Sequence, residues 1–130
     1  MFRSFLSVVA GYLSMVVVVG ASFAVLLAAV PSVFPSEPGP FDGPAWVLLV
    51  ELGFSLVAAL LGGFVCGLVA NRAHMRHAIV LASLMLVLGL VSAAMGVGMK
   101  PLWSSLAIAV FPPLATLGGA ALRVRMLRAM

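Results

Sequence analysis

Four long apolar stretches, separated by short polar connections, make up most of the sequence. They cover residues 5–30, 45–70, 78–97 and 102–122. About 20 helical residues are needed to cross the roughly 30 Å of hydrocarbon in a bilayer, so each stretch is long enough. None contains Lys, Arg or Asp, and Glu51 is the only acid within them. The pattern predicts an all-α integral membrane four-helix bundle of two helical hairpins, forming a single transmembrane domain over residues 1–130.

The connections between these stretches are short and polar. Residues 31–44 hold five prolines, two glycines, Glu37 and Asp42. Proline fixes φ and lacks an amide donor, so this segment is predicted to be a non-helical, water-facing outer loop. Residues 71–77 read as a basic turn, and residues 98–101 as a tight hairpin turn. No connection is long enough to form a soluble domain.

The composition agrees with a membrane protein. Of the 130 residues, 65% are hydrophobic and 8% are charged, and the mean hydropathy is +1.31. A soluble domain carries about 25% charged residues. These values exclude a soluble enzyme, an intrinsically disordered chain and a nucleic-acid-binding domain. The single cysteine, Cys66, excludes an intrachain disulfide and a cysteine metal site within one chain.

The first apolar stretch shares some features with a secretory signal peptide. Arg3 precedes it, and Ser22-Phe23-Ala24 resembles a cleavage site. However, the apolar run continues past that site to 26 residues. Signal peptides have an apolar core of about 7–15 residues, so the length favours an uncleaved membrane anchor.

The basic residues fall mainly on one side of the predicted bundle. Six arginines lie on the side of the two termini: Arg3, Arg72, Arg76, Arg123, Arg125 and Arg128. Lys100 lies on the other side. Because basic residues are enriched on the cytoplasmic side, both termini are predicted to be cytoplasmic. Trp46 and Trp103 then fall at the outer interface, where indole rings are enriched.

Small residues form rows along the second stretch. One row is Ala58, Gly62, Cys66 and Ala70, and the adjacent row is Ser55, Ala59, Gly63 and Gly67. In a bilayer, small residues let helix backbones approach closely. We therefore predict that this helix lies at the centre of the bundle, with Ala59, Gly62, Gly63 and Gly67 as packing positions. Shorter rows occur elsewhere: Gly20, Ala24 and Ala28; Ser92 and Gly96; and Ala115 and Gly119.

Two consecutive prolines, Pro112 and Pro113, lie near the middle of the fourth stretch. They remove helical hydrogen bonds to the carbonyls of Ile108 and Ala109, which then need another partner or water. The simplest interpretation is a static kink that fits the bundle. The functional alternative is a hinge or a cavity-lining break, as found in transporters.

Glu51 is the most informative single residue. It lies six residues, or about 9 Å, inside the second stretch from Ala45. An acid at that depth indicates a functional role by default. The alternative is local neutralisation: an ion pair with Lys100, which falls on the same side, protonated burial, or a hydrogen bond with Ser55 one turn away.

The remaining polar residues indicate no chemistry. His74 and His77 are close in sequence, but Arg72 and Arg76 beside them oppose a metal cation. Contact with anionic lipid headgroups is the favoured interpretation. The chain lacks a nucleophile elbow, a phosphate loop, an HExxH motif and paired intramembrane carboxylates. We therefore expect no enzyme activity, no catalytic residues, no cofactor and no metal.

The two halves of the chain contain a weak internal similarity. Pro44-Ala45-Trp46 is followed by Leu61-Gly62-Gly63, and Pro101-Leu102-Trp103 is followed by Leu117-Gly118-Gly119. Two hairpins in the same orientation would form a parallel repeat. Interfacial Trp and packing Gly also recur independently in membrane helices, so this interpretation stays open beside the repeat.

Three groups of residues together resemble a known class of protein. They are residues 9–13, Gly62-Gly63-Phe64-Val65 with the run from Arg72 to Ala78, and Pro101-Leu102-Trp103 with the later Pro112-Pro113 and Gly118-Gly119. This combination resembles the small, uncharacterised four-span inner-membrane proteins of bacteria, over nearly the whole chain. The resemblance implies a four-span fold and a bacterial inner (cytoplasmic) membrane. It supplies no activity. Small multidrug transporters, by contrast, place their essential acid in the first span.

Two functions fit these observations, and a third, a membrane-bound enzyme subunit, fits them less well because the chain lacks catalytic groups. The first is a non-enzymatic structural or accessory membrane subunit that acts by helix packing, with itself or within a larger membrane complex. The second is a small homo-oligomeric transporter or channel, in which Glu51 binds the cation or proton and Pro112-Pro113 forms the break. The expected partners are the lipid bilayer and membrane proteins, and no nucleic acid is expected.

Overall fold

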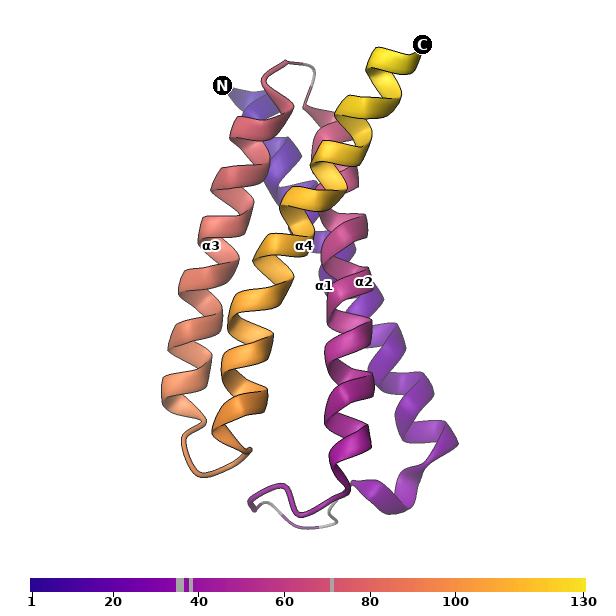
Figure 1. Cartoon of the computed structure of the whole chain (residues 1–130), viewed down its shortest axis with the longest axis vertical. Coiled ribbons are helices and arrows are strands. Elements are labelled where there is room, and N and C mark those ends of the chain that lie inside the picture. Colours follow the sequence, from indigo (N-terminus) through magenta and orange to yellow (C-terminus); the bar gives the residue numbers. More distant parts are fainter. Residues whose placement is uncertain (35–36, 38, 71) are drawn as a thin grey trace.

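The chain folds into four long α-helices (Figure 1). The computed structural model describes residues 1–34, 37, 39–70 and 72–130. The helices are α1 (Phe2–Ala29), α2 (Ala45–Val69), α3 (His74–Met95) and α4 (Leu102–Ala129), with a short 3₁₀ turn η1 (Pro31–Val33) after α1. Each of the four is long and apolar enough to cross a membrane. The predicted all-α four-helix architecture is confirmed. Within the predicted outer loop, residues 35, 36 and 38 lie outside the described residues.

Three helix ends extend beyond the apolar stretches. α1 begins at Phe2, α3 at His74 and α4 continues to Ala129, seven residues past the predicted end of the span at 122. Hydropathy locates the part of a helix that lies in hydrocarbon, whereas backbone hydrogen bonding continues into water. Arginine is also a good helix former, and positive charge is favourable near a helix C-terminus.

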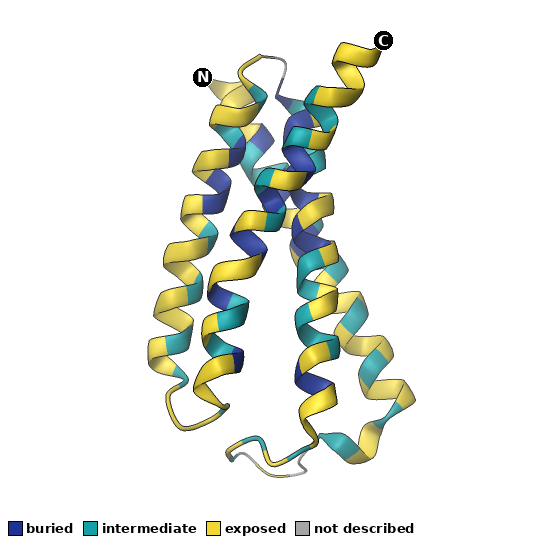
Figure 2. Ribbon diagram, viewed as in Figure 1, coloured by how far each residue is buried: buried dark blue, intermediate teal, exposed yellow. Residues whose placement is uncertain are grey.

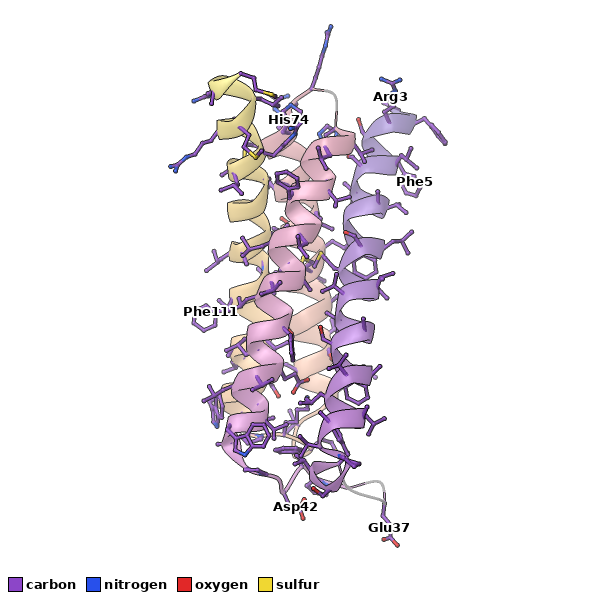
Figure 3. The ribbon with its side chains drawn as sticks, turned by 90° about the vertical axis from the view of Figure 1, so that its right-hand side faces the viewer. Arg3, Phe5, Glu37, Asp42, His74 and Phe111 are labelled. Atoms are coloured by element: carbon purple, nitrogen blue, oxygen red, sulfur yellow. The ribbon has the colours of Figure 1, made fainter. Side chains whose placement is uncertain are left out.

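Alternate connections lie at opposite ends of the molecule. Figure 1 places both termini and the α2–α3 connection at one end, and the α1–α2 and α3–α4 connections at the other. Figure 3 places Arg3 and His74 at the first end, called here the arginine-rich end, and Glu37 and Asp42 at the second. This up-and-down arrangement is the one expected for four membrane crossings.

Helix α2 packs against both α1 and α4, and α3 packs mainly against α4. The small residues in the second half of α2 lie in these contacts: Ala58, Ala59, Gly62, Gly63, Cys66 and Gly67 are buried, as is Ala70 just after the helix. Figure 2 shows that buried positions concentrate in the half of the bundle nearer the arginine-rich end. The small-residue rows of α2 therefore serve helix packing within this chain.

The α2–α4 crossing depends on two glycines. A Cβ added to Gly63 would collide with the backbone of Thr116, and a Cβ added to Gly119 would collide with the backbone of Leu60. When the two similar halves of the sequence are aligned, Gly63 corresponds to Gly119 and Leu60 corresponds to Thr116. Each glycine therefore contacts the residue that corresponds to its own helix's contact residue, and the two contacts are related by symmetry. A parallel repeat predicts this symmetry.

The opposite side of α2 packs closely against α1. A Cβ on Gly11 would come within 2.8 Å of the Gly62 carbonyl oxygen and 2.9 Å of Cys66 Cβ. Beside this contact, Met15, Cys66 and Leu81 are buried together in one apolar cluster. Close contact between α1 and α2 thus also depends on glycines, which have no side chain to hold the backbones apart. This is expected in lipid, where apolar burial alone does not drive helices together.

Helix α4 remains one continuous helix through Pro112 and Pro113, and Figure 1 shows it changing direction near its middle. Both prolines are buried. Ala109, whose carbonyl loses its helical donor, is 1% exposed, and a Cβ on the neighbouring Gly89 of α3 would lie 3.0 Å from its Cα. Helix α3 therefore covers this part of the kink and separates it from lipid.

Candidate functional site around Glu51

The turn between α3 and α4 positions Lys100. Gly98 has φ +87°, a conformation that favours glycine. The Met99 amide donates to the Gly96 carbonyl at 3.0 Å, which closes the turn. Pro101 follows immediately and caps the start of α4. Lys100 therefore projects from a tight and well-defined turn at the end of the bundle opposite the arginines.

Lys100 forms an ion pair with Glu51 of α2. Its Nζ lies 2.7 Å from Glu51 Oε1 and 2.9 Å from Oε2, so the ammonium group contacts both carboxylate oxygens. The Lys100 and Glu51 side chains are 37% and 34% exposed. The structure thus brings together the two residues that the sequence suggested as an ion pair, and each charge neutralises the other.

Ser55 forms a hydrogen bond with the backbone of Glu51 and not with its side chain. Its Oγ donates to the Glu51 backbone carbonyl at 2.9 Å, along the helix, and not to the carboxylate. The hydroxyl group is thereby satisfied within α2, and the carboxylate oxygens remain available to Lys100.

A second contact joins the two hairpins beside the ion pair. The Phe41 amide, in the connection between α1 and α2, donates to the Met99 carbonyl at 2.6 Å. Because Met99 precedes Lys100 in the α3–α4 turn, this hydrogen bond holds the turn next to α2. The ion pair and the hydrogen bond together connect the hairpins at this end of the bundle.

Glu51 borders two cavities. The larger, of about 280 Å³, lies toward α3 and α4; it is lined by Glu51, Gly89, Ser92, Ala93, Gly96, Met99, Lys100, Ser105 and Ile108. The smaller, of about 60 Å³, lies toward α1; it is lined by Val19, Ser22, Phe23, Leu26, Glu51, Phe54 and Ser55. A carboxylate between two cavities could bind a small cation, but in this arrangement the Lys100 ammonium occupies that position.

Comparison of the chain with protein-family models, with curated proteins and with solved structures finds no match. Within residues 1–34, 37, 39–70 and 72–130, no group of three or more His, Cys, Asp or Glu side chains is arranged to hold a metal ion.

The two prolines and the packing positions of α2 lie away from Glu51, whereas Ser92 and Gly96 of α3 line the larger cavity beside it. Pro112 and Pro113 are buried in α4 and line neither cavity, and the packing positions Ala59, Gly62, Gly63 and Gly67 lie in helix contacts. The structure does not bring the prolines and Glu51 into one site.

Several packing residues were not predicted from the sequence. Gly11 contacts α2, and Thr116 Oγ1 lies 3.1 Å from both Met85 Sδ and the Pro112 carbonyl oxygen. Gly11 lies four residues before Met15, at the spacing of one helix face, and this was the available signal. For Thr116 no sequence signal exists, because its partner Met85 belongs to another helix.

Proposed function

We propose that this small multi-pass membrane protein is a non-enzymatic structural or accessory subunit of a bacterial inner membrane, with both termini in the cytoplasm. It would act by packing its helices against those of a larger membrane complex or of further copies of itself. The six arginines at the end that holds both termini support this orientation, because cytoplasmic segments carry the excess of basic residues.

The observation that carries the proposal is an unused row of small residues on α1. Gly20, Ala24 and Ala28 are all exposed, and a Cβ on Gly20 would meet nothing within 4 Å. The corresponding rows of α2 and α4 are occupied by contacts within the chain. Since small residues allow close helix approach in lipid, the α1 row supports contact with a helix from another chain.

The ion pair supports the non-enzymatic part of the proposal. Glu51 is the only acid within a predicted span, and its carboxylate is 2.7 Å from the Lys100 ammonium on the other hairpin. In this role, Glu51 and Lys100 join the hairpins.

Gly20→Ile is expected to abolish the association while leaving the fold intact. A β-branched side chain on the α1 row would hold a facing backbone away, whereas its Cβ would meet no neighbouring helix of its own chain within 4 Å. The measurement is purification in mild detergent, with crosslinking and mass spectrometry of co-purifying chains. Wild type should retain a stoichiometric partner chain, and Gly20→Ile should lose it.

The matched control is Gly53→Ile on α2. Gly53 is also an exposed helical glycine with nothing within 4 Å of an added Cβ. The control should retain the partner. Loss of the partner in both variants, or retention in both, would remove the support for the α1 row as an association surface.

A second candidate function is a small homo-oligomeric transporter or channel that uses Glu51. The specific observation in its favour is that Glu51 borders cavities on two sides, toward α1 and toward α3 and α4. For transport, Lys100 would have to release the carboxylate so that a proton or cation can bind.

This second function predicts that Glu51→Gln stops proton flux in liposomes. The accessory function predicts that wild-type protein and Glu51→Gln give the same background flux as empty liposomes. A flux above background that requires Glu51 would favour the transporter over the accessory subunit.

A further inference from the structure

The charges of this protein are separated between its two ends. The sequence contains three acidic side chains. Figure 3 places Glu37 and Asp42 at the end opposite the arginines, and Glu51 lies toward the same end, against Lys100 of the α3–α4 turn. Glu51 is already paired with Lys100. Among the described residues, none of the six arginines forms an ion pair with a carboxylate side chain, so their guanidinium groups are available to anions from outside the chain.

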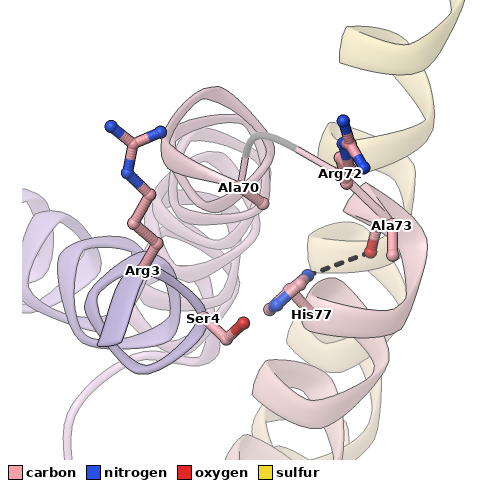
Figure 4. A pocket seen from close by; sticks show the side chains of 6 residues that line it. All are labelled: Arg3, Ser4, Ala70, Arg72, Ala73 and His77. Atoms are coloured by element: carbon pink, nitrogen blue, oxygen red, sulfur yellow. Dashed lines mark hydrogen bonds between the residues drawn. The ribbon is translucent and has the colours of Figure 1, made fainter. Parts of the chain in front are cut away.

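A cavity of about 340 Å³ lies at the arginine-rich end between α1, the end of α2 and the start of α3. It is lined by Arg3, Ser4, Ala70, Arg72, Ala73 and His77. Figure 4 shows Arg3 and Arg72 on opposite sides of this cavity, with Ser4 and His77 facing each other between α1 and α3. The two guanidinium groups supply positive charge and hydrogen-bond donors, and the Ser4 hydroxyl can donate as well, which suits an anion.

The structure fixes the orientation of His77 in this cavity. Its Nδ1 lies 3.0 Å from the Ala73 carbonyl oxygen, and since a carbonyl only accepts, Nδ1 carries the proton. The hydrogen bond holds the imidazole ring at the rim next to Ser4.

A second, apolar cavity continues directly from the first. It measures about 590 Å³ and shares Ser4, Ala73 and His77 with the polar cavity. Its remaining lining is Phe5, Val8, Arg76 and Val80, so it runs along the groove between α1 and α3 toward the membrane interior. A basic polar pocket that opens into an apolar groove matches an amphiphile with an anionic head.

We propose that this surface binds one anionic phospholipid from the leaflet at the arginine-rich end. Arg3 and Arg72 hold the phosphate, and one acyl chain lies in the groove against Phe5, Val8 and Val80. Basic pockets between membrane helices on the cytoplasmic side are suited to such headgroups. This lipid site is separate from the α1 row at Gly20 and does not depend on the proposed association.

The test is native mass spectrometry of the purified protein in detergent, titrated with phosphatidylglycerol or with phosphatidylcholine of the same acyl chains. Wild type should bind phosphatidylglycerol at least about tenfold more tightly. Arg3→Gln/Arg72→Gln should lower that affinity about 30-fold, because each basic residue at an anionic surface contributes about fivefold. The matched control is Arg125→Gln/Arg128→Gln, which removes the same charge outside the pocket and should change the affinity less than about threefold.

The groove is tested separately with Val80→Trp, which fills it. Val87→Trp is the control, since Val80 and Val87 of α3 are 57% and 58% exposed and Val87 lines none of these cavities. Val80→Trp should weaken phosphatidylglycerol binding, Val87→Trp should not, and excess inorganic phosphate should not displace the lipid.

Equal losses in the two arginine double variants would show diffuse charge attraction and overturn the proposal. Displacement by phosphate with no effect of Val80→Trp would show a free-anion site and would also overturn it.

Discussion

Gly63→Leu is expected to lower the free energy of unfolding by about 3 kcal/mol, the largest effect of any single change considered. A Cβ at Gly63 already collides with the backbone of Thr116, and backbone cannot move aside as a flexible side chain can. The larger side chain would force α2 and α4 apart along their crossing. The measurement is equilibrium unfolding in mixed micelles with increasing SDS.

The matched control is Gly53→Leu in the same helix. An added Cβ there meets nothing within 4 Å, so a change within about 0.5 kcal/mol is expected. Gly67→Leu should fall between the two, because its Cβ would meet the flexible side chain of Arg123 at 3.2 Å. If Gly63→Leu and Gly53→Leu were tolerated equally, the central role of the α2–α4 crossing would be wrong.

Lys100→Met is expected to destabilise the protein by about 1–2 kcal/mol, the second largest effect. The substitution leaves the Glu51 carboxylate near the membrane interior without its partner, and an unpaired acid there is costly. The effect stays below that of a fully buried pair because both side chains are about one third exposed.

A double-mutant cycle separates the pair from its surroundings. Glu51→Gln/Lys100→Met removes both charges and should recover most of the stability lost in Lys100→Met, with an interaction energy of at least about 1 kcal/mol. Additive effects of the two single changes would mean that the 2.7 Å contact contributes nothing to joining the hairpins.

The spans and the packing face of α2 follow from the sequence because they depend on local properties. Hydropathy over about 20 residues locates each crossing, and the spacing of Gly63 and Gly67 identifies one helix face. The pairing of Glu51 with Lys100 was also suggested by the sequence, since few charged residues share that end. Each of these features can be predicted from the residues of a single helix, or from the few charged residues at one end of the bundle.

The identity of contacts between helices did not follow from the sequence. The approach of Gly11 to Gly62, and of Thr116 to Met85, depends on crossing angles that no single helix determines. The helix ends at Phe2 and Ala129 were missed for a different reason, because hydropathy marks the membrane boundary and not the end of backbone hydrogen bonding.

The central proposal is that this protein works as a subunit associated with other chains. Light scattering coupled to size-exclusion chromatography, on wild-type protein extracted in mild detergent, tests it most directly by giving the protein mass of the particle. We expect a mass well above the 13.4 kDa of one chain, from a stoichiometric partner or further copies. A particle that contains one 13.4 kDa chain alone would contradict it.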